Sequence, residues 1–218
     1  MNYTVSLIFS FSIAIAAIAG WVRFKRLGPA FYPFLVMVTL ATCNETISAI
    51  IIKVFHKSNA INANIYSLIE ALIITWQFKN WKLFRSSGKL FYAICLLLIL
   101  VWCIEIFYLS SIRQFSSYFN IFYGFVTAMM SISMINYLLL LLQPTPVTKS
   151  ILIICICFII FYTYSALIEI FWIWGLGASK IFRRDIFRIL YFINLFSNLA
   201  YAFAILWVPR KRTFLSPS

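Results

Sequence analysis

The fold is decided by residues 39–77, TLATCNETISAIIIKVFHKSNAINANIYSLIEALIITWQ. Two hydrophobic segments in this stretch are joined by a short polar connection. Each segment carries a glutamate near its midpoint, Glu45 in the first and Glu70 in the second. An ionisable side chain at bilayer depth costs roughly 2.5–3.5 kcal/mol on insertion scales, so such side chains usually face a bundle interior or a cavity. The stretch therefore predicts a hairpin of two membrane helices with a polar interior.

The composition of the whole chain indicates a membrane protein. Of its 218 residues, 64% are hydrophobic and 11% are charged, and the mean hydropathy is +0.97. Soluble domains average about 45–50% apolar and about 25% charged residues. A water-soluble core of this size could not bury so much apolar surface, and we therefore expect an all-α integral membrane protein.

Hydrophobic segments separated by short polar connections predict one domain, residues 1–218, built as a bundle of seven transmembrane helices with short loops. The predicted spans are about 5–22, 31–55, 61–78, 90–110, 121–142, 151–174 and 186–208. We expect the first to be a retained helix and not a signal peptide, because basic residues follow it and none precedes it. Ser12, Ala16 and Gly20 have the small-xxx-small spacing that allows close helix contact.

The distribution of basic residues predicts the orientation in the membrane. Lysine and arginine outnumber aspartate and glutamate 18 to 5, and eleven of them fall on the side of the C-terminus against seven on the other. The positive-inside rule then places the N-terminus outside and the C-terminus in the cytoplasm, and we expect the inner (plasma) membrane of a bacterium. Four bases before the last span oppose this assignment: Lys180, Arg183, Arg184 and Arg188. We expect anionic lipid headgroups, and not nucleic acid, as the partners of these bases.

Polar side chains inside the predicted spans define a candidate binding site. No lysine or arginine lies at the depth of Glu45 or Glu70, so each carboxylate is expected to be protonated or to hold a cation, and two facing carboxylates would share one proton. The expected ligand- or ion-binding residues are Glu45, Glu70, Asn44, Asn198, Asn194 and Ser67. The expected outer vestibule contains Glu105, Glu169, Tyr191 and Tyr201.

Less specific interpretations of these residues stay open. Neutral polar side chains can simply form hydrogen bonds between helices, at about 0.6 kcal/mol per contact. Glu105 and Glu169 each lie within about two turns of a span end, where Arg113 or Arg188 could pair with them. The polar residues of the last span share one helical stripe, which is predicted to face the bundle interior; they are Tyr191, Asn194, Asn198 and Tyr201.

The reactive residues argue against common enzyme classes. The only histidine is His56, in a predicted loop, which disfavours a Ser–His pair or a histidine-ligated metal within the membrane. All five cysteines fall in hydrophobic segments, where they behave as small apolar residues. No glycine motif for nucleotide binding is present. We therefore expect a protein that is not an enzyme and uses no cofactor or metal.

Two functions remain as hypotheses. The first is a small transporter or ligand-binding carrier for a small polar or cationic ligand, with a proton- or cation-sensitive carboxylate. The alternative is a non-catalytic membrane subunit or sensor that docks a partner membrane protein laterally in the bilayer, because short loops leave little soluble surface. A polar cavity that reaches Glu45 or Glu70 would favour the first, and a tightly packed interior would favour the second.

Overall fold

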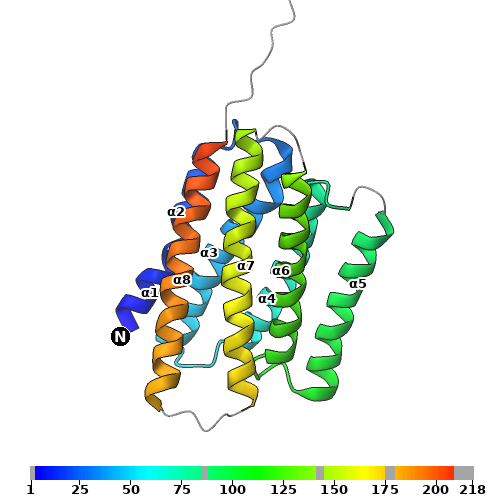
Figure 1. The fold of residues 1–218 in the computed structure, drawn as a ribbon. Coiled ribbons are helices and arrows are strands. Elements are labelled where there is room, and N and C mark those ends of the chain that lie inside the picture. Colours follow the sequence, from blue (N-terminus) through cyan, green and yellow to red (C-terminus); the bar gives the residue numbers. More distant parts are fainter. Residues whose placement is uncertain (1–2, 85–87, 141–144, 175–179, 209–218) are drawn as a thin grey trace, which may run out of the picture.

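The computed structural model describes residues 3–84, 88–140, 145–174 and 180–208. Within these ranges the chain is helical, without strands, and the helices form seven rods packed side by side (Figure 1). The main helices are α1 (Tyr3–Phe11), α2 (Ile13–Val22), α3 (Tyr32–Lys53), α4 (Ala60–Asn80), α5 (Gly88–Ile104), α6 (Ser117–Leu139), α7 (Pro146–Ile173) and α8 (Lys180–Trp207). The all-helical prediction is confirmed for the described part of the chain.

Five segments are long and apolar enough to cross a membrane. They are Pro29–Lys53, Gly88–Leu109, Ser117–Leu139, Pro146–Ile173 and Asp185–Trp207. The first rod contributes a shorter apolar stretch, Leu7–Val22. Helix α4 has 21 residues and is more polar. Large apolar side chains cover the outside of the bundle, with Leu139 71% and Phe196 67% exposed, which is the surface of an integral membrane protein.

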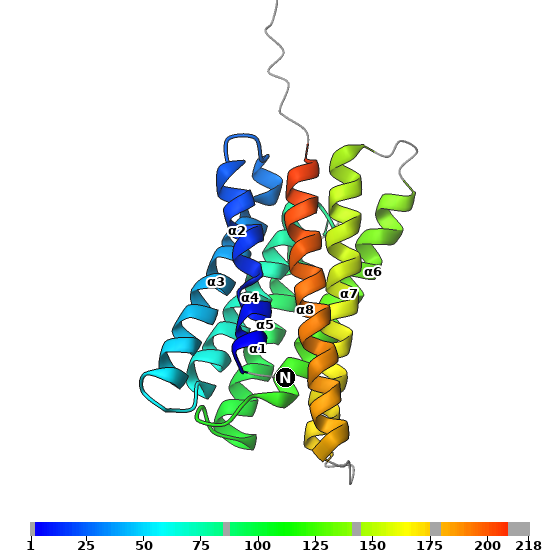
Figure 2. The same cartoon turned by 90° about the vertical axis from the view of Figure 1, so that its left-hand side faces the viewer.

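The first rod is broken at Ser12, where the sequence predicts one continuous helix over 5–22. The Ser12 hydroxyl donates to the carbonyl oxygen of Phe9 at 2.6 Å and accepts from Nδ2 of Asn198 at 2.8 Å. A serine bonded back to its own helix competes with the backbone ladder, so α1 and α2 meet at this residue. Figure 2 shows the two helices in line, beside α3 and α8.

The small-residue face of this rod packs inward, as predicted. Ser12, Ala16 and Gly20 are all buried. A Cβ on Gly20 would collide with Cδ1 of Leu35 on α3 and lie 3.7 Å from Cδ1 of Ile205 on α8. The small size of these residues therefore allows α2 to lie close to both neighbours.

Helices α7 and α8 begin earlier than the sequence predicts. Helix α7 begins at Pro146 and not near residue 151, because the Thr145 hydroxyl accepts from the backbone N–H of Thr148 at 3.2 Å and proline suits the first helical turn. Helix α8 begins at Lys180 and not near residue 186. The bases that precede the predicted last span are therefore part of the same helix.

Helix α6 begins at Ser117 and not near residue 121, because a distant residue caps it. Glu105 stands where α5 changes into a π-helical turn, Glu105–Leu109. Its Oε1 accepts from the N–H of Tyr118 at 3.1 Å, and its Oε2 accepts from the N–H of Phe119. A carboxylate at a helix N-terminus satisfies free N–H groups and complements the helix dipole.

The helix ends define two faces of the bundle (Figure 1). We call one the basic end; it contains the end of α2, the end of α4 and the start of α7, with Arg23, Lys25, Arg26, Lys79, Lys82 and Lys149. The other, the vestibule end, contains the connection 54–59 between α3 and α4, and the segment 110–116 before α6. Arg23 donates to the carbonyl oxygens of Ile205 and Leu206, which caps the last turn of α8 at the basic end.

An aromatic cluster fills the bundle between its middle and the basic end. Phe34, Phe158 and Tyr201 come from α3, α7 and α8, and their ring centroids lie 5.4–6.3 Å apart. Phe78 of α4 joins them at 6.2 Å from Phe158. Gln77 stands beside this cluster, accepting from the N–H of Phe34 at 2.6 Å and donating to the carbonyl oxygen of Ala30 at 2.6 Å. The bundle is therefore densely packed on this side.

Candidate functional site

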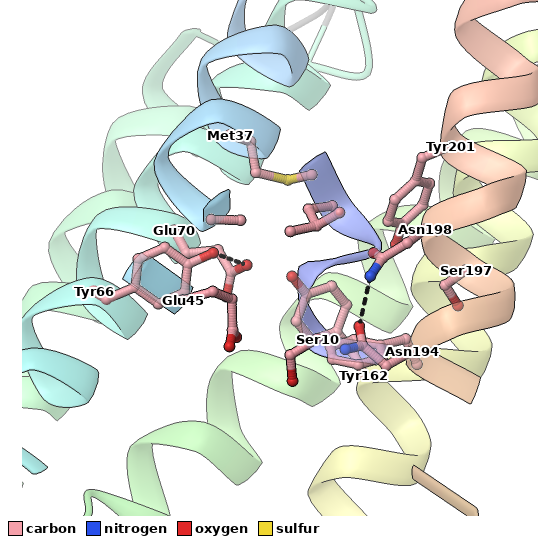
Figure 3. Close-up of a pocket in the computed structure, with 13 residues that line it drawn as sticks. Ser10, Met37, Glu45, Tyr66, Glu70, Tyr162, Asn194, Ser197, Asn198 and Tyr201 are labelled. Atoms are coloured by element: carbon pink, nitrogen blue, oxygen red, sulfur yellow. Dashed lines mark hydrogen bonds between the residues drawn. The ribbon is translucent and has the colours of Figure 1, made fainter. Parts of the chain in front are cut away.

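A cavity of about 150 Å³ lies at the centre of the bundle, next to the aromatic cluster. It is bordered by α1, α2, α3, α4, α7 and α8, so no single pair of helices forms it. Figure 3 shows Glu45, Tyr66 and Glu70 on one side of it and Asn194, Asn198 and Tyr201 on the other. The structure thus brings Glu45 and Glu70 into one cavity with both asparagines of the last span.

Glu70 is held by tyrosine hydroxyl groups. Tyr66, one helical turn earlier on α4, donates to Oε1 at 2.7 Å, and Tyr123 on α6 donates to Oε2 at 2.6 Å. The Tyr162 hydroxyl, from α7, also lies close to this carboxylate. Both oxygens of Glu70 therefore have a donor within the protein, and its position is fixed by three helices.

Glu45 is less enclosed and has a different environment. The Ser10 side chain of α1 lies beside its carboxylate, and the carboxylate also interacts electrostatically with that of Glu70. Both Glu45 and Ser10 line a second, wider pocket of about 320 Å³. That pocket is bordered by Ile52, Asn59 and Ala63, which places it at the vestibule end. Glu45 thus lines both the central cavity and the wider pocket.

The wider pocket has a polar wall made by α3 and α4. Asn62 donates through Nδ2 to Oδ1 of Asn44 at 2.7 Å and to the Ser48 hydroxyl at 3.1 Å. Asn59 also donates to the Ser48 hydroxyl, at 3.2 Å. Asn44 and Tyr191 line this pocket and not the central cavity. These contacts fix the hairpin of α3 and α4 at its turn.

The polar stripe of α8 faces inward, as predicted. Asn194, Asn198 and Tyr201 line the central cavity, and Tyr191 lines the wider pocket. Asn198 donates through Nδ2 to Ser12 at 2.8 Å and to Oδ1 of Asn194 at 3.3 Å. One contact of this stripe therefore reaches the break between α1 and α2.

Three predicted site residues lie elsewhere. Ser67 is buried and donates to the carbonyl oxygen of Asn64 at 3.0 Å. Glu105 is 2% exposed and caps α6, and Glu169 accepts from the Ser117 hydroxyl at 2.7 Å near the same helix start. None of the three lines either cavity. The predicted vestibule is therefore formed differently: Tyr191 belongs to it, whereas Tyr201 belongs to the central cavity.

Neither Arg113 nor Arg188 pairs with Glu105 or Glu169 in the structure. Glu105 is bound by backbone N–H groups, and Glu169 by Ser117 and by Nδ2 of Asn120 at 3.4 Å. Arg188 instead pairs with Asp185 on its own helix at 3.2 Å. The physical reason is that the start of α6 offers donors to both carboxylates: its free backbone N–H groups bind Glu105, and the side chains of Ser117 and Asn120 bind Glu169.

The lining of both cavities is acidic and aromatic. No lysine, arginine or histidine is among the residues that line them in the described part of the chain. The described residues also contain no group of three or more histidine, cysteine, aspartate or glutamate side chains that could hold a metal ion. The carboxylates of the site can therefore bind a proton, or they can balance the charge of a small cation and accept hydrogen bonds from it.

Sequence reasoning missed several residues of this site. Tyr66 is four residues before Glu70, so helical spacing could have placed it on the same face. Tyr123, Tyr162 and Ser10 come from other helices and carry no signal in the sequence that links them to a glutamate. The chain matches no protein-family model, and no curated protein and no solved structure is significantly similar to it.

Proposed function

We propose that the protein is a small membrane carrier or ligand-binding protein whose site is the central cavity with Glu45 and Glu70. The observation that carries this proposal is a cavity at the centre of the bundle lined by two carboxylates and by no basic side chain among the described residues. Buried carboxylates without a cationic partner are costly in a membrane and are typical of ion, proton or ligand sites. A tightly packed interior would favour the alternative of lateral docking, whereas Glu45 lines two cavities.

The proposal includes a topology. All seven rods cross the bilayer, with the N-terminus outside, the C-terminus in the cytoplasm and the basic end at the cytoplasmic surface of a bacterial inner membrane. The wider pocket then opens outward. The aromatic cluster of Phe34, Phe78, Phe158 and Tyr201 closes the central cavity toward the cytoplasm. A ligand or ion reaches Glu45 from the outside.

Thermal unfolding of the purified full chain in detergent tests the carboxylates. A cation or proton that binds only the folded state raises the unfolding temperature by mass action. We expect sodium, potassium or mild acidification to stabilise the protein, and we expect Glu45→Gln and Glu70→Gln each to abolish that response.

The matched control is Glu169→Gln, a glutamate that lines neither cavity. It should keep the full response to cations and to pH. If all three variants respond as the unchanged protein does, Glu45 and Glu70 only hold helices together, and the proposed function is wrong.

A further inference from the structure

The wall of the central cavity formed by α8 carries polar side chains. The Tyr201 side chain is 5% exposed, and the Ser197 side chain is 1% exposed. Both side chains line the cavity. Figure 3 shows the Tyr201 ring extending from α8 toward Asn198. Polar side chains that line a cavity are available to hydrogen-bond an occupant, so this wall favours a polar one.

Asn198 adds an acceptor to the same wall. Its Nδ2 is used by Ser12 and Asn194, whereas its Oδ1 accepts from no described residue. Its side chain is 3% exposed. This wall therefore offers an amide oxygen that accepts and a tyrosine hydroxyl that donates or accepts.

The opposite wall carries both carboxylates of the cavity, Glu45 and Glu70. Glu70 already accepts from the hydroxyl groups of Tyr66 and Tyr123, whereas Glu45 also lines the wider pocket and is the first carboxylate that an occupant from that side meets. Its neighbour Ser10 stands at the junction with the wider pocket. The occupant thus meets a negative charge on the side from which it arrives.

The size and lining of the cavity favour an organic cation over a metal ion. Hard metal ions take six or more oxygen ligands at short distance, and the described residues hold no cluster of metal-ligating side chains here. Tyr66, Phe161, Tyr162 and Tyr201 line the cavity, and aromatic rings attract ammonium groups that lie over their faces. An apolar cavity of about 150 Å³ in T4 lysozyme holds benzene, so this space suits about six non-hydrogen atoms.

We propose that the central cavity binds a compact organic ammonium ion that carries a second polar group. The ammonium lies against Glu45 and the aromatic faces, and the polar group at its other end contacts Asn198 and Tyr201. This inference rests on the proposed function, because it names the ligand class of the same site.

Binding of four probes to the purified full chain in detergent tests the inference, with thermal unfolding as the readout. Ethanolammonium has the required charge, length and hydroxyl; ethylammonium lacks the hydroxyl; ethylene glycol lacks the charge; tetraethylammonium is too large for the cavity. We expect saturable stabilisation by ethanolammonium, at least tenfold weaker apparent affinity for ethylammonium, and no effect of the other two.

Two variants and a control locate the ligand. Glu45→Gln should abolish the response to both ammonium ions. Tyr201→Phe should remove the preference for ethanolammonium over ethylammonium and leave ethylammonium binding unchanged, which a general loss of stability would not do. Tyr118→Phe, a change at an exposed tyrosine on α6, should keep the preference.

The outcomes separate this inference from the proposed function. One outcome is that sodium or protons stabilise the protein through Glu45 while neither ammonium ion has an effect. That result overturns the ligand class and leaves the proposed function standing. No response to any cation or to pH overturns both. Two results would overturn the assigned position of the ligand. One is that tetraethylammonium binds as tightly as ethanolammonium, and the other is that Tyr201→Phe keeps the preference for ethanolammonium.

Discussion

The hydroxyl of Tyr123 on α6 donates to Oε2 of Glu70 on α4 at 2.6 Å, across 53 residues of sequence. A side chain from a distant helix thus holds the buried carboxylate at the edge of the cavity. The same contact joins α4 and α6, so Glu70 connects the binding site to the packing of the bundle.

Removing the Tyr123 hydroxyl should destabilise the protein. Tyr123→Phe leaves one oxygen of Glu70 without its donor, and hydrogen bonds to charged groups contribute about 1.5–3 kcal/mol. We expect a lower unfolding temperature in detergent. Tyr108→Phe, at a tyrosine 85% exposed, serves as the control and should leave the temperature unchanged; an equal effect of both changes would contradict the assigned role.

The cap on α6 gives a second prediction. Glu105→Ala removes the acceptor for the N–H groups of Tyr118 and Phe119, and loss of a helix cap costs about 0.5–2 kcal/mol. We expect faster limited proteolysis in the segment 110–116 and a lower unfolding temperature. Ser111→Ala, an exposed position in the same segment, should behave as the unchanged protein. A Glu105→Ala variant with unchanged proteolysis would show that α6 does not need this cap.

Asn64 should be among the least replaceable polar residues. Its Nδ2 donates to the carbonyl oxygens of Ile112 and Gln114, at 3.1 and 2.6 Å, and its Oδ1 accepts from the N–H of Ser116 at 3.0 Å. Asn64→Ala leaves three buried or partly buried backbone groups unpaired, at about 1–3 kcal/mol for each buried one. We expect poor recovery of folded protein by size-exclusion chromatography, whereas Asn136→Ala, at an exposed asparagine of α6, should be recovered normally. Normal recovery of both would contradict this.

Two glycines should respond differently to alanine. A Cβ on Gly124 of α6 would lie 3.0 Å from the backbone oxygen of Tyr162 on α7, which cannot move by itself. A Cβ on Gly20 meets only the end of the Leu35 side chain, which can adopt another rotamer. Alanine gains about 1 kcal/mol over glycine inside a helix, and overpacking costs about 1–3 kcal/mol.

We therefore expect Gly124→Ala to lower the unfolding temperature and Gly20→Ala to leave it unchanged or raise it. Calorimetry or a thermal-shift measurement gives the unfolding temperature of each purified variant for comparison with the unchanged protein. The reverse order would show that α2 is packed more rigidly than α6.

Reporter fusions test the topology. Three predicted spans separate the connection 54–59 from the connection 144–150, so fusions in these two segments should report opposite sides of the membrane. Fusions at 144–150 and at the C-terminus should both report the cytoplasm. A fusion at 54–59 that reports the same side as one at 144–150 would exclude the seven-span arrangement.

Composition and helical spacing were enough to predict the membrane character, the helical architecture and the inward direction of the polar stripe on α8. These follow from composition and helical spacing, because the cost of exposing polar groups to lipid depends on the local pattern alone. The same reasoning indicated Glu45 and Glu70 and the interior position of Asn194 and Asn198. A helix start that has a local cap, such as Thr145 before α7, could also have been predicted from the sequence.

Which polar residues share a cavity depends on how the helices pack against one another. Glu105 and Glu169 have the same chemistry as Glu45 and Glu70, yet they bind the start of α6, because that helix end lies beside them in space. Tyr123 joins Glu70 and Asn198 joins Ser12 across 53 and 186 residues. Such pairings depend on how the helices pack, and the spacing of residues along one helix carries no information about its neighbours.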